Sequence, residues 1–342
     1  MAGITSALSG IGFELRRSWP RSADQLLLDL QPIQDASGKP VAGQWFRDPD
    51  RARSTAASTP GATCAGHVVL QPGGADQKLV PLSDLLREPR TELVSHRPER
   101  RAVLRHHGEG DDRYTKVVAV KKHQTLERAT RLAQALPVRT PRVYSTDPTR
   151  GTVTTEALPG RTLHDLLTGP RAEAGCTATG AALAALHRIP PPSDVPVHGW
   201  FEEQAVTQQW QEYAATYRAP LAMPRPPDDD VAAEASVGAS RTLIHRDFHD
   251  RQVLIDDDGS VGILDFDLMA IGDPALDLAN LLAHLDLRCR QGLVDDAEPL
   301  RQAALLGYGP GQEIAWRIPG YEALARQRLA AVYAFRTTRH IT

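Results

Sequence analysis

The chain has 342 residues, which is more than one small core requires and favours two lobes or domains. Apolar residues make up 41% and charged residues 24%, a globular composition, and the net charge of −3 gives no basic surface for nucleic acid. No apolar run is long enough to predict a membrane span. The three cysteines suit neither a disulfide framework nor a metal pair, so we expect a reduced, cytoplasmic protein. Residues 1–13 lack a basic start and a cleavage site and are interpreted as mature protein.

Residues 1–90 carry few strong signals. Apolar runs at 25–30 and 67–71 predict two strands, and the Ala-, Ser- and Thr-rich residues 51–61 predict a loop or a weak helix. Residues 79–86 have helical spacing. We expect residues 1–90 to form an N-terminal extension, either a cap or added strands of the lobe that follows.

The pattern is clearer in residues 91–158. Three alternating segments separated by turns predict an antiparallel meander at 92–96, 101–105 and 114–120. A helical period follows over residues 125–136 and ends at prolines. Two more strands are expected at 143–145 and 151–157. Residues 91–158 are therefore the expected small lobe and hinge.

Residues 159–342 are mostly helical in pattern. Helices are predicted at 163–167, 174–187, 201–218 and 276–287, with further helix up to the end of the chain. Residues 243–272 instead indicate short strands separated by turns. A β-rich part, one helix, a linker strand and a helical part predict a bilobal α+β fold, with a small antiparallel β lobe and a larger, mostly helical lobe.

The densest chemical signal lies in residues 242–267. Asp247 stands in a polar loop after a short apolar run, and Gln252, five positions later, precedes a second run. A hairpin turn at 257–259 leads into a third run, which ends on Asp265. The hairpin would bring the Asp265 carboxylate beside the Gln252 amide oxygen, and such hard donors suit Mg²⁺ carrying nucleotide phosphates. Asp247 can then accept the proton of an attacking hydroxyl, which completes the parts that phosphoryl transfer needs.

The order of these residues resembles a known family. His245-x-Asp247, then Gln252, a strand and Asp265, is similar to the catalytic core shared by protein kinases and aminoglycoside phosphotransferases. The segment Gly-Asp-Pro-Ala-Leu-Asp-Leu-Ala at 272–279 resembles the aminoglycoside-kinase and choline-kinase side. A protein kinase would instead show Asp-Phe-Gly and Ala-Pro-Glu. Gln at 252, where Asn is commoner, is similar to maltokinases and bacterial glucosamine kinases.

This resemblance covers about residues 92–335 and implies both fold and chemistry. It implies a protein-kinase-like fold and transfer of the γ-phosphate of ATP or GTP, with Mg²⁺, to a hydroxyl of a small molecule. Asp247 would be the catalytic residue, and Gln252 and Asp265 would be the metal ligands. The role of Asp267 stays open between metal, substrate and local backbone.

The resemblance also implies a nucleotide site. Lys116 matches the family's Tyr-x-Lys-Val strand, where a lysine binds the α- and β-phosphates, and Glu127 in the next helix is its expected partner. Residues 154–160 resemble the hinge, so the Thr155 carbonyl and the Ala157 N–H would meet the adenine edge. The expected phosphate loop, residues 95–100, has no glycine.

Neighbouring polar residues have expected structural roles. Asp273 before Pro274 predicts a helix N-cap, and Asp277 is expected to brace the catalytic loop. We expect His245 to bond backbone around that loop and His187 to be a structural hydrogen bonder.

The acceptor is less well determined than the reaction. The acidic residues 202–203 and 228–230 would suit an aminoglycoside antibiotic, although such runs are also typical of solvated loops. Gln252 and the N-terminal extension, weakly similar to that of maltokinases, favour a sugar or an amino sugar instead. The oligomeric state stays open.

Two other function classes would use some of the same residues. His245, Asp247, His249 and Asp250 form a dense set of potential ligands for a metal-dependent hydrolase, but the further histidines lack suitable spacing. A non-catalytic nucleotide-binding module is the second alternative. The presence of Lys116, Asp247, Gln252 and Asp265 together argues against it.

Overall fold

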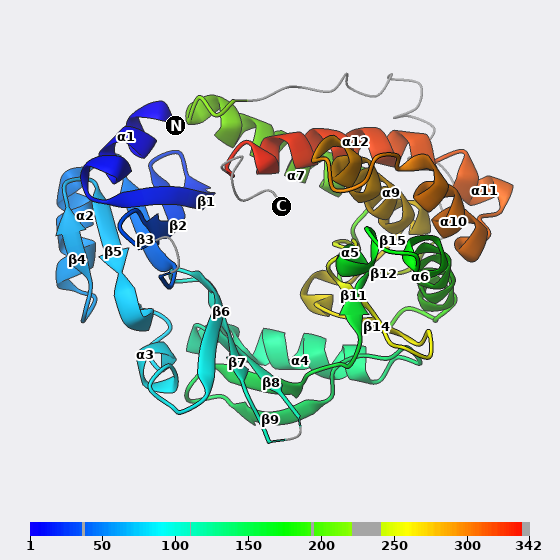
Figure 1. The fold of residues 1–342 in the computed structure, drawn as a ribbon, viewed down its shortest axis with the longest axis horizontal. Coiled ribbons are helices and arrows are strands. Elements are labelled where there is room, and N and C mark those ends of the chain that lie inside the picture. Colours follow the sequence, from blue (N-terminus) through cyan, green and yellow to red (C-terminus); the bar gives the residue numbers. More distant parts are fainter. Residues whose placement is uncertain (36–37, 110, 193–194, 221–240, 337–342) are drawn as a thin grey trace.

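The computed structural model describes residues 1–35, 38–109, 111–192, 195–220 and 241–336. Three parts follow one another around the molecule in Figure 1: an N-terminal sheet, a small β lobe and a large helical lobe. The last helices of the large lobe return towards the N-terminal sheet. No helix among the described residues is both long and apolar enough to cross a membrane.

The N-terminal part is an antiparallel sheet of its own, with strand order β1-β2-β3-β5-β4. Its strands are β1 (Phe13–Ser22), β2 (Gln25–Pro32), β3 (Val41–Phe46), β4 (Thr63–Ala65) and β5 (Val68–Gln71). The helices α1 (Ala2–Gly10) and α2 (Pro49–Ala57) accompany it, followed by the short turn η1 (Pro72–Gly74). The strands predicted at 25–30 and 67–71 are thus present as β2 and β5, and none of the five is hydrogen-bonded into the small-lobe sheet.

The N-terminal sheet is anchored on the large lobe. Leu26, Leu28 and Leu30 of β2 are fully buried in a cluster that also contains Tyr217 and Phe335 from the far end of the chain. The backbone N–H of Ser18 donates to the carbonyl of Phe335 at 2.8 Å. Burial of such side chains is the main favourable term in packing, so this sheet is held against the helical lobe by a shared core.

The small lobe contains the predicted meander. Its sheet has the order β6-β7-β8-β10-β9, with every pair antiparallel. The elements are α3 (Leu82–Leu85), β6 (Thr91–Arg97), β7 (Arg101–His106), β8 (Arg113–Val118), η2 (Val120–Lys122), α4 (His123–Gln134), β9 (Val143–Asp147) and β10 (Thr152–Glu156). Lys116 lies opposite Val103 on one side and Val153 on the other, so it stands on the central strand.

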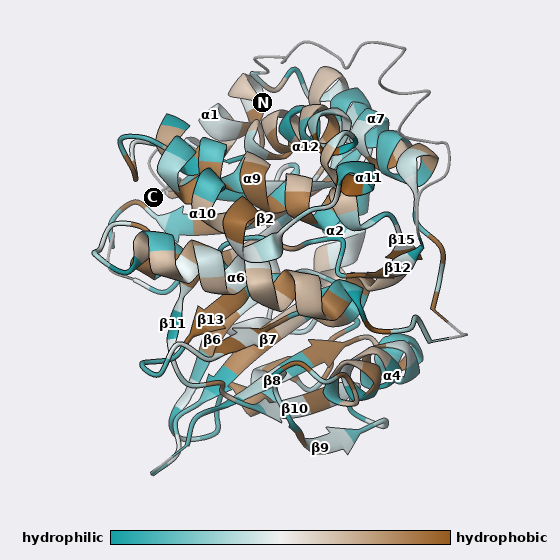
Figure 2. Cartoon of the chain, turned by 90° about the vertical axis from the view of Figure 1, so that its right-hand side faces the viewer, coloured by the Kyte–Doolittle hydropathy of each residue, from teal (hydrophilic) through white to brown (hydrophobic). Residues whose placement is uncertain are grey.

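The large lobe contains seven helices among the described residues: α5 (Leu163–Leu166), α6 (Ala172–His187), α7 (Trp200–Thr216), α9 (Pro274–Arg290), α10 (Glu298–Tyr308), α11 (Gln312–Ala315) and α12 (Ile318–Tyr333). Two small sheets join them: β11 (Arg161–Thr162) with β13 (Val253–Ile255) and β14 (Val261–Ile263), and β12 (Thr242–Ile244) with β15 (Ala270–Gly272). The turn η3 (Phe266–Leu268) follows β14. Figure 2 shows hydrophobic residues along α6 and α9, which pack in the centre of this lobe.

Helix α9 begins as the sequence predicts. The Asp273 carboxylate accepts the N–H of Ala275 at 3.0 Å, and Pro274 occupies the first turn. The helix is buried on nearly all sides, and its leucines and alanines pack in the core of the large lobe. The predicted plan of a small antiparallel lobe followed by a larger helical lobe is confirmed.

Candidate active site

A cavity of about 680 Å³ lies between the small lobe and the large lobe. Its walls include Lys116 from β8, Thr155 and Ala157 from the hinge, and Gln252 and Asp265 from the β13–β14 hairpin. Residues far apart in the sequence therefore meet at one cavity, as the sequence motifs require.

Lys116 is held by two carboxylates. Its Nζ lies 2.7 Å from Oδ1 of Asp265 and 2.8 Å from Oδ1 of Asp267. Burial alone would lower the pKa of Lys116, but the two carboxylates outweigh it and raise that pKa above its usual value. Lys116 is therefore a fixed positive charge in the cavity, suited to bind phosphate oxygens.

The expected pairing of Lys116 with Glu127 is wrong. Glu127 accepts from Nη2 of Arg131, one helical turn further along α4, at 2.8 Å and from Oγ1 of Thr146 at 3.3 Å. A local i,i+4 partner satisfies this glutamate. Glu127 does not line the cavity, so its assignment to the nucleotide site loses its structural basis.

Asp265 and Asp267 titrate in opposite directions. Burial raises the pKa of each, but Lys116 and Arg101 lower that of Asp265 below its usual value. The pKa of Asp267 is raised, because burial and the neighbouring Asp265 charge exceed the effect of Lys116. The Asp265 backbone has φ of +60°, an uncommon conformation for a residue with a side chain, and such strain is typical of functional sites.

These oxygens fit a divalent cation. The Leu264 N–H donates to the Gln252 carbonyl at 2.8 Å, and this contact keeps position 252 beside Asp265 in the hairpin. Burial and the neighbouring Asp265 charge raise the pKa of Asp267 despite Lys116, and a bound cation would stabilise the ionised form of this carboxylate. Gln252 and Asp265, together with Asp267, offer the amide and carboxylate oxygens that Mg²⁺ prefers.

The loop that carries Asp247 is braced from beneath. Fully buried Asp277 accepts the backbone N–H of His245 at 2.6 Å and that of Arg246 at 2.7 Å. His187 Nε2 donates to the same carboxylate at 3.1 Å, and His245 Nε2 donates to the Leu264 carbonyl at 2.7 Å. The predicted structural roles of Asp277, His245 and His187 are confirmed.

Asp247 itself is half-buried and chemically available. Within the described residues, no hydrogen bond or ion pair engages its carboxylate. A carboxylate held by its backbone, with its side chain unused, suits a group that must accept a proton from an incoming hydroxyl.

A second brace went undetected in the sequence. Asp250, fully buried, accepts from Nε and Nη2 of Arg288 at 2.8 and 3.0 Å and from Nδ1 of His164 at 2.6 Å. His249, Asp250 and His284 lie close enough to hold a metal, but Arg288 already engages both Asp250 oxygens. This geometry weighs against the metal-hydrolase alternative. In the sequence, the only sign of the bracing role of Asp250 is its charge within the catalytic loop.

Replacing Asp277 by Asn is expected to lower the free energy of unfolding by about 1–3 kcal/mol, because an amide nitrogen would face a buried N–H donor. Burial raises the Asp277 pKa, but the hydrogen bond from His187 and its charge outweigh it, so the net pKa lies below the usual 3.8. The additional unfolding free energy of the wild type over Asp277→Asn is therefore present above pH 3.8 and is lost as the pH falls below it. Urea denaturation from pH 7 to pH 3 checks this, with Asp257→Asn at the exposed hairpin turn as control. A larger difference in unfolding free energy between the wild type and Asp277→Asn at pH 3 than at pH 7 would contradict this prediction.

The hinge differs from expectation at one position. Thr155 and Ala157 line the cavity, but the Ala157 N–H already donates to the Asp112 carbonyl at 2.9 Å. The expectation of a free Ala157 donor for adenine is therefore wrong. The cause is tertiary, because the loop before β8 comes alongside the hinge and continues the pairing of β8 with β10.

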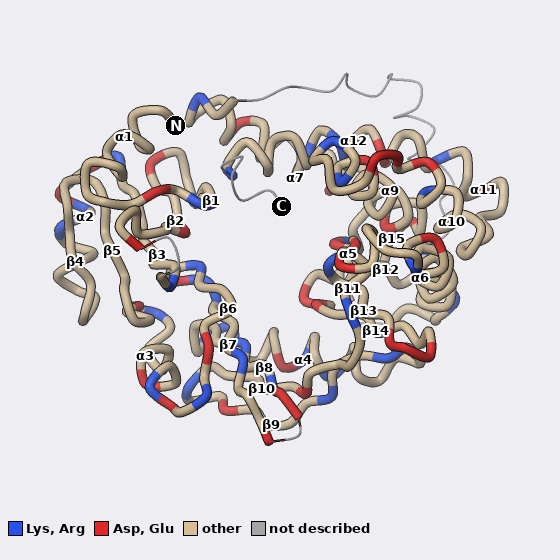
Figure 3. The backbone as a smooth tube through the Cα atoms, viewed as in Figure 1, with Lys and Arg blue, Asp and Glu red and all other residues tan. Residues whose placement is uncertain are grey.

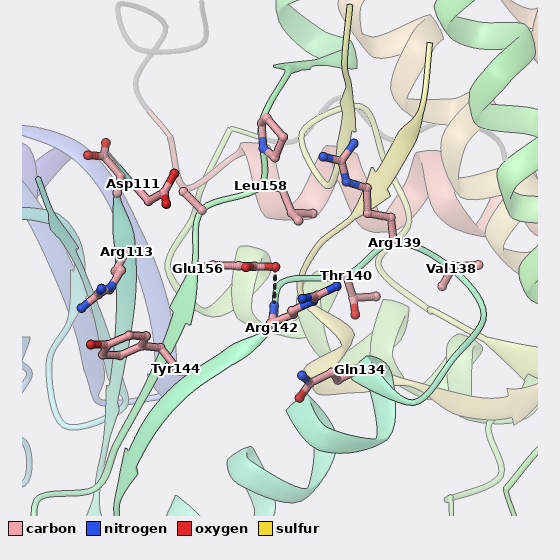
Figure 4. A pocket seen from close by; sticks show the side chains of 13 residues that line it. Asp111, Arg113, Gln134, Val138, Arg139, Thr140, Arg142, Tyr144, Glu156 and Leu158 are labelled. Atoms are coloured by element: carbon pink, nitrogen blue, oxygen red, sulfur yellow. Dashed lines mark hydrogen bonds between the residues drawn. The ribbon is translucent and has the colours of Figure 1, made fainter. Parts of the chain in front are cut away.

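A second cavity of about 720 Å³ adjoins the hinge (Figure 4). It shares Thr140, Glu156, Ala157 and Leu158 with the first cavity but lacks Lys116 and Asp265. In this view the backbone N–H of Arg142 donates to the Glu156 carboxylate at 3.1 Å. This space extends the nucleotide cavity at its hinge end and holds none of the phosphate-side residues.

The bilobal fold, the hinge cavity and the paired carboxylates on a strand lysine define a phosphotransferase that acts on small molecules and uses a nucleotide. Residues 85–316, more than half of the chain, match the model of the phosphotransferase enzyme family, so the chain belongs to this family.

Two solved structures are similar to this chain to different degrees. The aminoglycoside phosphotransferase APH(3'')-Id of Streptomyces rimosus, in complex with ADP and streptomycin, is 19% identical, with a TM-score of 0.51 over 73% of this chain and 98% of that one. The choline kinase LicA of Streptococcus pneumoniae is 14% identical, with a TM-score of 0.49 over 76% and 90% of the two chains. A search of curated proteins finds no match.

Proposed function

We propose that this chain transfers the γ-phosphate of ATP or GTP, bound with Mg²⁺, to a hydroxyl of a small molecule in the cytoplasm. The acceptor is either an antibiotic of the aminoglycoside or another class, or a sugar or amino sugar. The observation that carries the proposal is the convergence of Lys116, Asp265 and Asp267 in the cavity between the lobes.

Each residue has a defined part in this reaction. Lys116 binds the α- and β-phosphates, and the hinge around Thr155 receives the base. Gln252 and Asp265 would hold Mg²⁺, which supplies charge neutralisation on the phosphates when bound. Asp247 orients the acceptor hydroxyl and takes its proton while the new oxygen–phosphorus bond forms and the bond to the β-phosphate oxygen breaks, releasing the nucleoside diphosphate.

One support for a polycationic acceptor is removed. Glu203 is buried, where His198 Nε2 donates to it at 2.9 Å and Arg328 pairs with it at 2.9 Å. Glu202 accepts the Gly199 N–H at 2.9 Å at the start of α7. Both glutamates are therefore used within the fold, and the acidic run 228–230 lies outside the described residues. This observation favours the sugar alternative.

A nucleotide-consumption screen tests the proposal. Release of ADP or GDP is measured with aminoglycosides, nucleoside and peptide antibiotics and free sugars as acceptors. We expect turnover with one class, loss of turnover in EDTA and its recovery on adding Mg²⁺. Asp265→Asn is expected to lower that turnover at least about tenfold, the effect of one lost charge contact. Nucleotide binding without turnover of any acceptor would favour the non-catalytic alternative.

A further inference from the structure

Four arginines from three separate parts of the chain form one cluster. Arg17 lies on β1, Arg97 and Arg101 flank the β6–β7 turn, and Arg336 follows α12. Figure 3 shows basic segments on β1 and on β6 and β7. Arg17 and Arg336 are joined by a backbone β-bridge. The tertiary fold alone gathers these charges, since they span almost the whole chain.

The cluster is built around Trp19. The guanidinium carbons of Arg17 and Arg97 lie 4.7 and 4.8 Å from the Trp19 ring centroid. Arg101 lies 3.7 Å from Asp265 and 3.6 Å from Asp267, so the cluster reaches the carboxylate pair. Stacking on an aromatic ring fixes two long side chains at low entropic cost.

These cations lack sufficient counter-charge. In the described part of the chain, neither Arg17 nor Arg97 has a carboxylate within ion-pair distance. Burial and the charges of Arg336 and Arg97 lower the pKa of Arg17 to about 8. Burial and Arg101 lower the pKa of Arg97 to about 10, although Asp247 and Asp265 oppose this. Like charges brought together in a partly desolvated place are unfavourable without an anion.

Polar donors in the cluster are also unused. Among the described residues, Nε1 of Trp19 and Nε of Arg336 are buried without a hydrogen-bond partner. Buried donors in native proteins are nearly always paired. An anionic oxygen placed among them would satisfy both the donors and the excess positive charge.

The cluster lies outside the nucleotide cavity. Arg17, Arg97 and Arg336 are absent from the walls of that cavity, whose phosphate-side cation is Lys116. The Asp247 and Asp265 carboxylates both raise the pKa of Arg97, and Arg101 lies 3.7 Å from Asp265, so the cluster borders the carboxylates between which phosphate would be transferred. Arg97 also belongs to the expected phosphate loop, residues 95–100, but Arg17 and Arg336 do not, so an anion bound by all three would belong to the acceptor.

We propose that the acceptor is a hydroxyl compound carrying an anionic group, a carboxylate or a phosphate, which Arg17, Arg97 and Arg336 bind beside Asp247. This inference rests on the proposed phosphotransfer and specifies its substrate class. Polycationic aminoglycosides would be repelled by the same charges.

Anion binding is tested first, because it needs no turnover. Inorganic phosphate and glucuronate are titrated by calorimetry into the full-length protein saturated with MgADP. We expect binding by the wild type and a loss of about tenfold in affinity in Arg17→Gln, the size of one charge-assisted hydrogen bond. The control Arg53→Gln, on the exposed surface of α2, should bind as the wild type does. Absence of wild-type binding to both probes overturns the proposal.

Turnover measurements then show whether the arginine cluster binds the acceptor or the nucleotide. ADP release is compared with glucose, glucuronate, glucose 6-phosphate and streptomycin. We expect the anionic sugars to have the lowest KM and Arg17→Gln to raise that KM about tenfold without changing the KM for ATP. Preference for streptomycin, or a raised KM for ATP in its place, overturns the proposal. Anion binding without turnover of any acceptor would instead refute the proposed function and leave the anion site standing.

Discussion

Replacing Asp247 by Asn is expected to lower kcat by about 10² to 10⁴-fold, the usual contribution of a positioned general base. The amide keeps the size of the side chain but cannot accept the hydroxyl proton. Because the Asp247 carboxylate has no partner within the described residues, the fold should not suffer. Steady-state ADP release with the best acceptor of the screen measures the change, and thermal unfolding monitors the fold.

A matched carboxylate in the same segment supplies the control. Asp258 is exposed at the hairpin turn, and Asp258→Asn is expected to keep wild-type turnover. The KM for ATP should also be unchanged in Asp247→Asn, since Asp247 does not line the nucleotide cavity. Full activity of this variant would remove Asp247 from the mechanism.

Lys116→Met is expected to lower kcat/KM for the nucleotide by about 10²-fold or more, because it removes one partner of a buried charge network. Asp265 and Asp267 would then face each other without the cation that now lies 2.7 and 2.8 Å away. We also expect weaker ADP binding, measured by calorimetry, since the fixed positive charge for the phosphates is lost.

The Glu127→Gln variant tests whether Lys116 depends on Glu127 or on the pair Asp265 and Asp267. Glu127 pairs with Arg131 on the surface of α4, and such exposed pairs contribute little. The kcat/KM of Glu127→Gln for the nucleotide should stay within about twofold of the wild type. Equal losses in Lys116→Met and Glu127→Gln would show that the lysine works through Glu127 and would contradict the geometry described here.

Local signals explain the successful predictions. The meander and α4 follow from alternation and helical period in consecutive residues. The roles of Asp273 as N-cap and Asp277 as brace of the catalytic loop could be predicted, because both residues lie within one continuous motif. By contrast, β1 and β3 were not predicted, because β1 is interrupted by arginines and proline and β3 contains Gly43 and Gln44.

Long-range contacts explain the failures. Glu127 was the expected partner of Lys116 because it lies early in the helix that follows, yet the carboxylates that reach Lys116 come from beyond residue 260. The Ala157 N–H appeared free because the loop carrying Asp112 could not be placed beside it. In both cases a partner distant in sequence displaced the local expectation.

The sequence by itself determined the class of reaction, because the donor groups for phosphoryl transfer occur in a fixed order and spacing between His245 and Asp277. Only the tertiary structure decided which charges meet. It placed Asp267 on Lys116 and gathered Arg17, Arg97 and Arg336 into one cluster. The physical reason is that electrostatic energy depends on distance and burial, whereas sequence spacing defines distance only within one element.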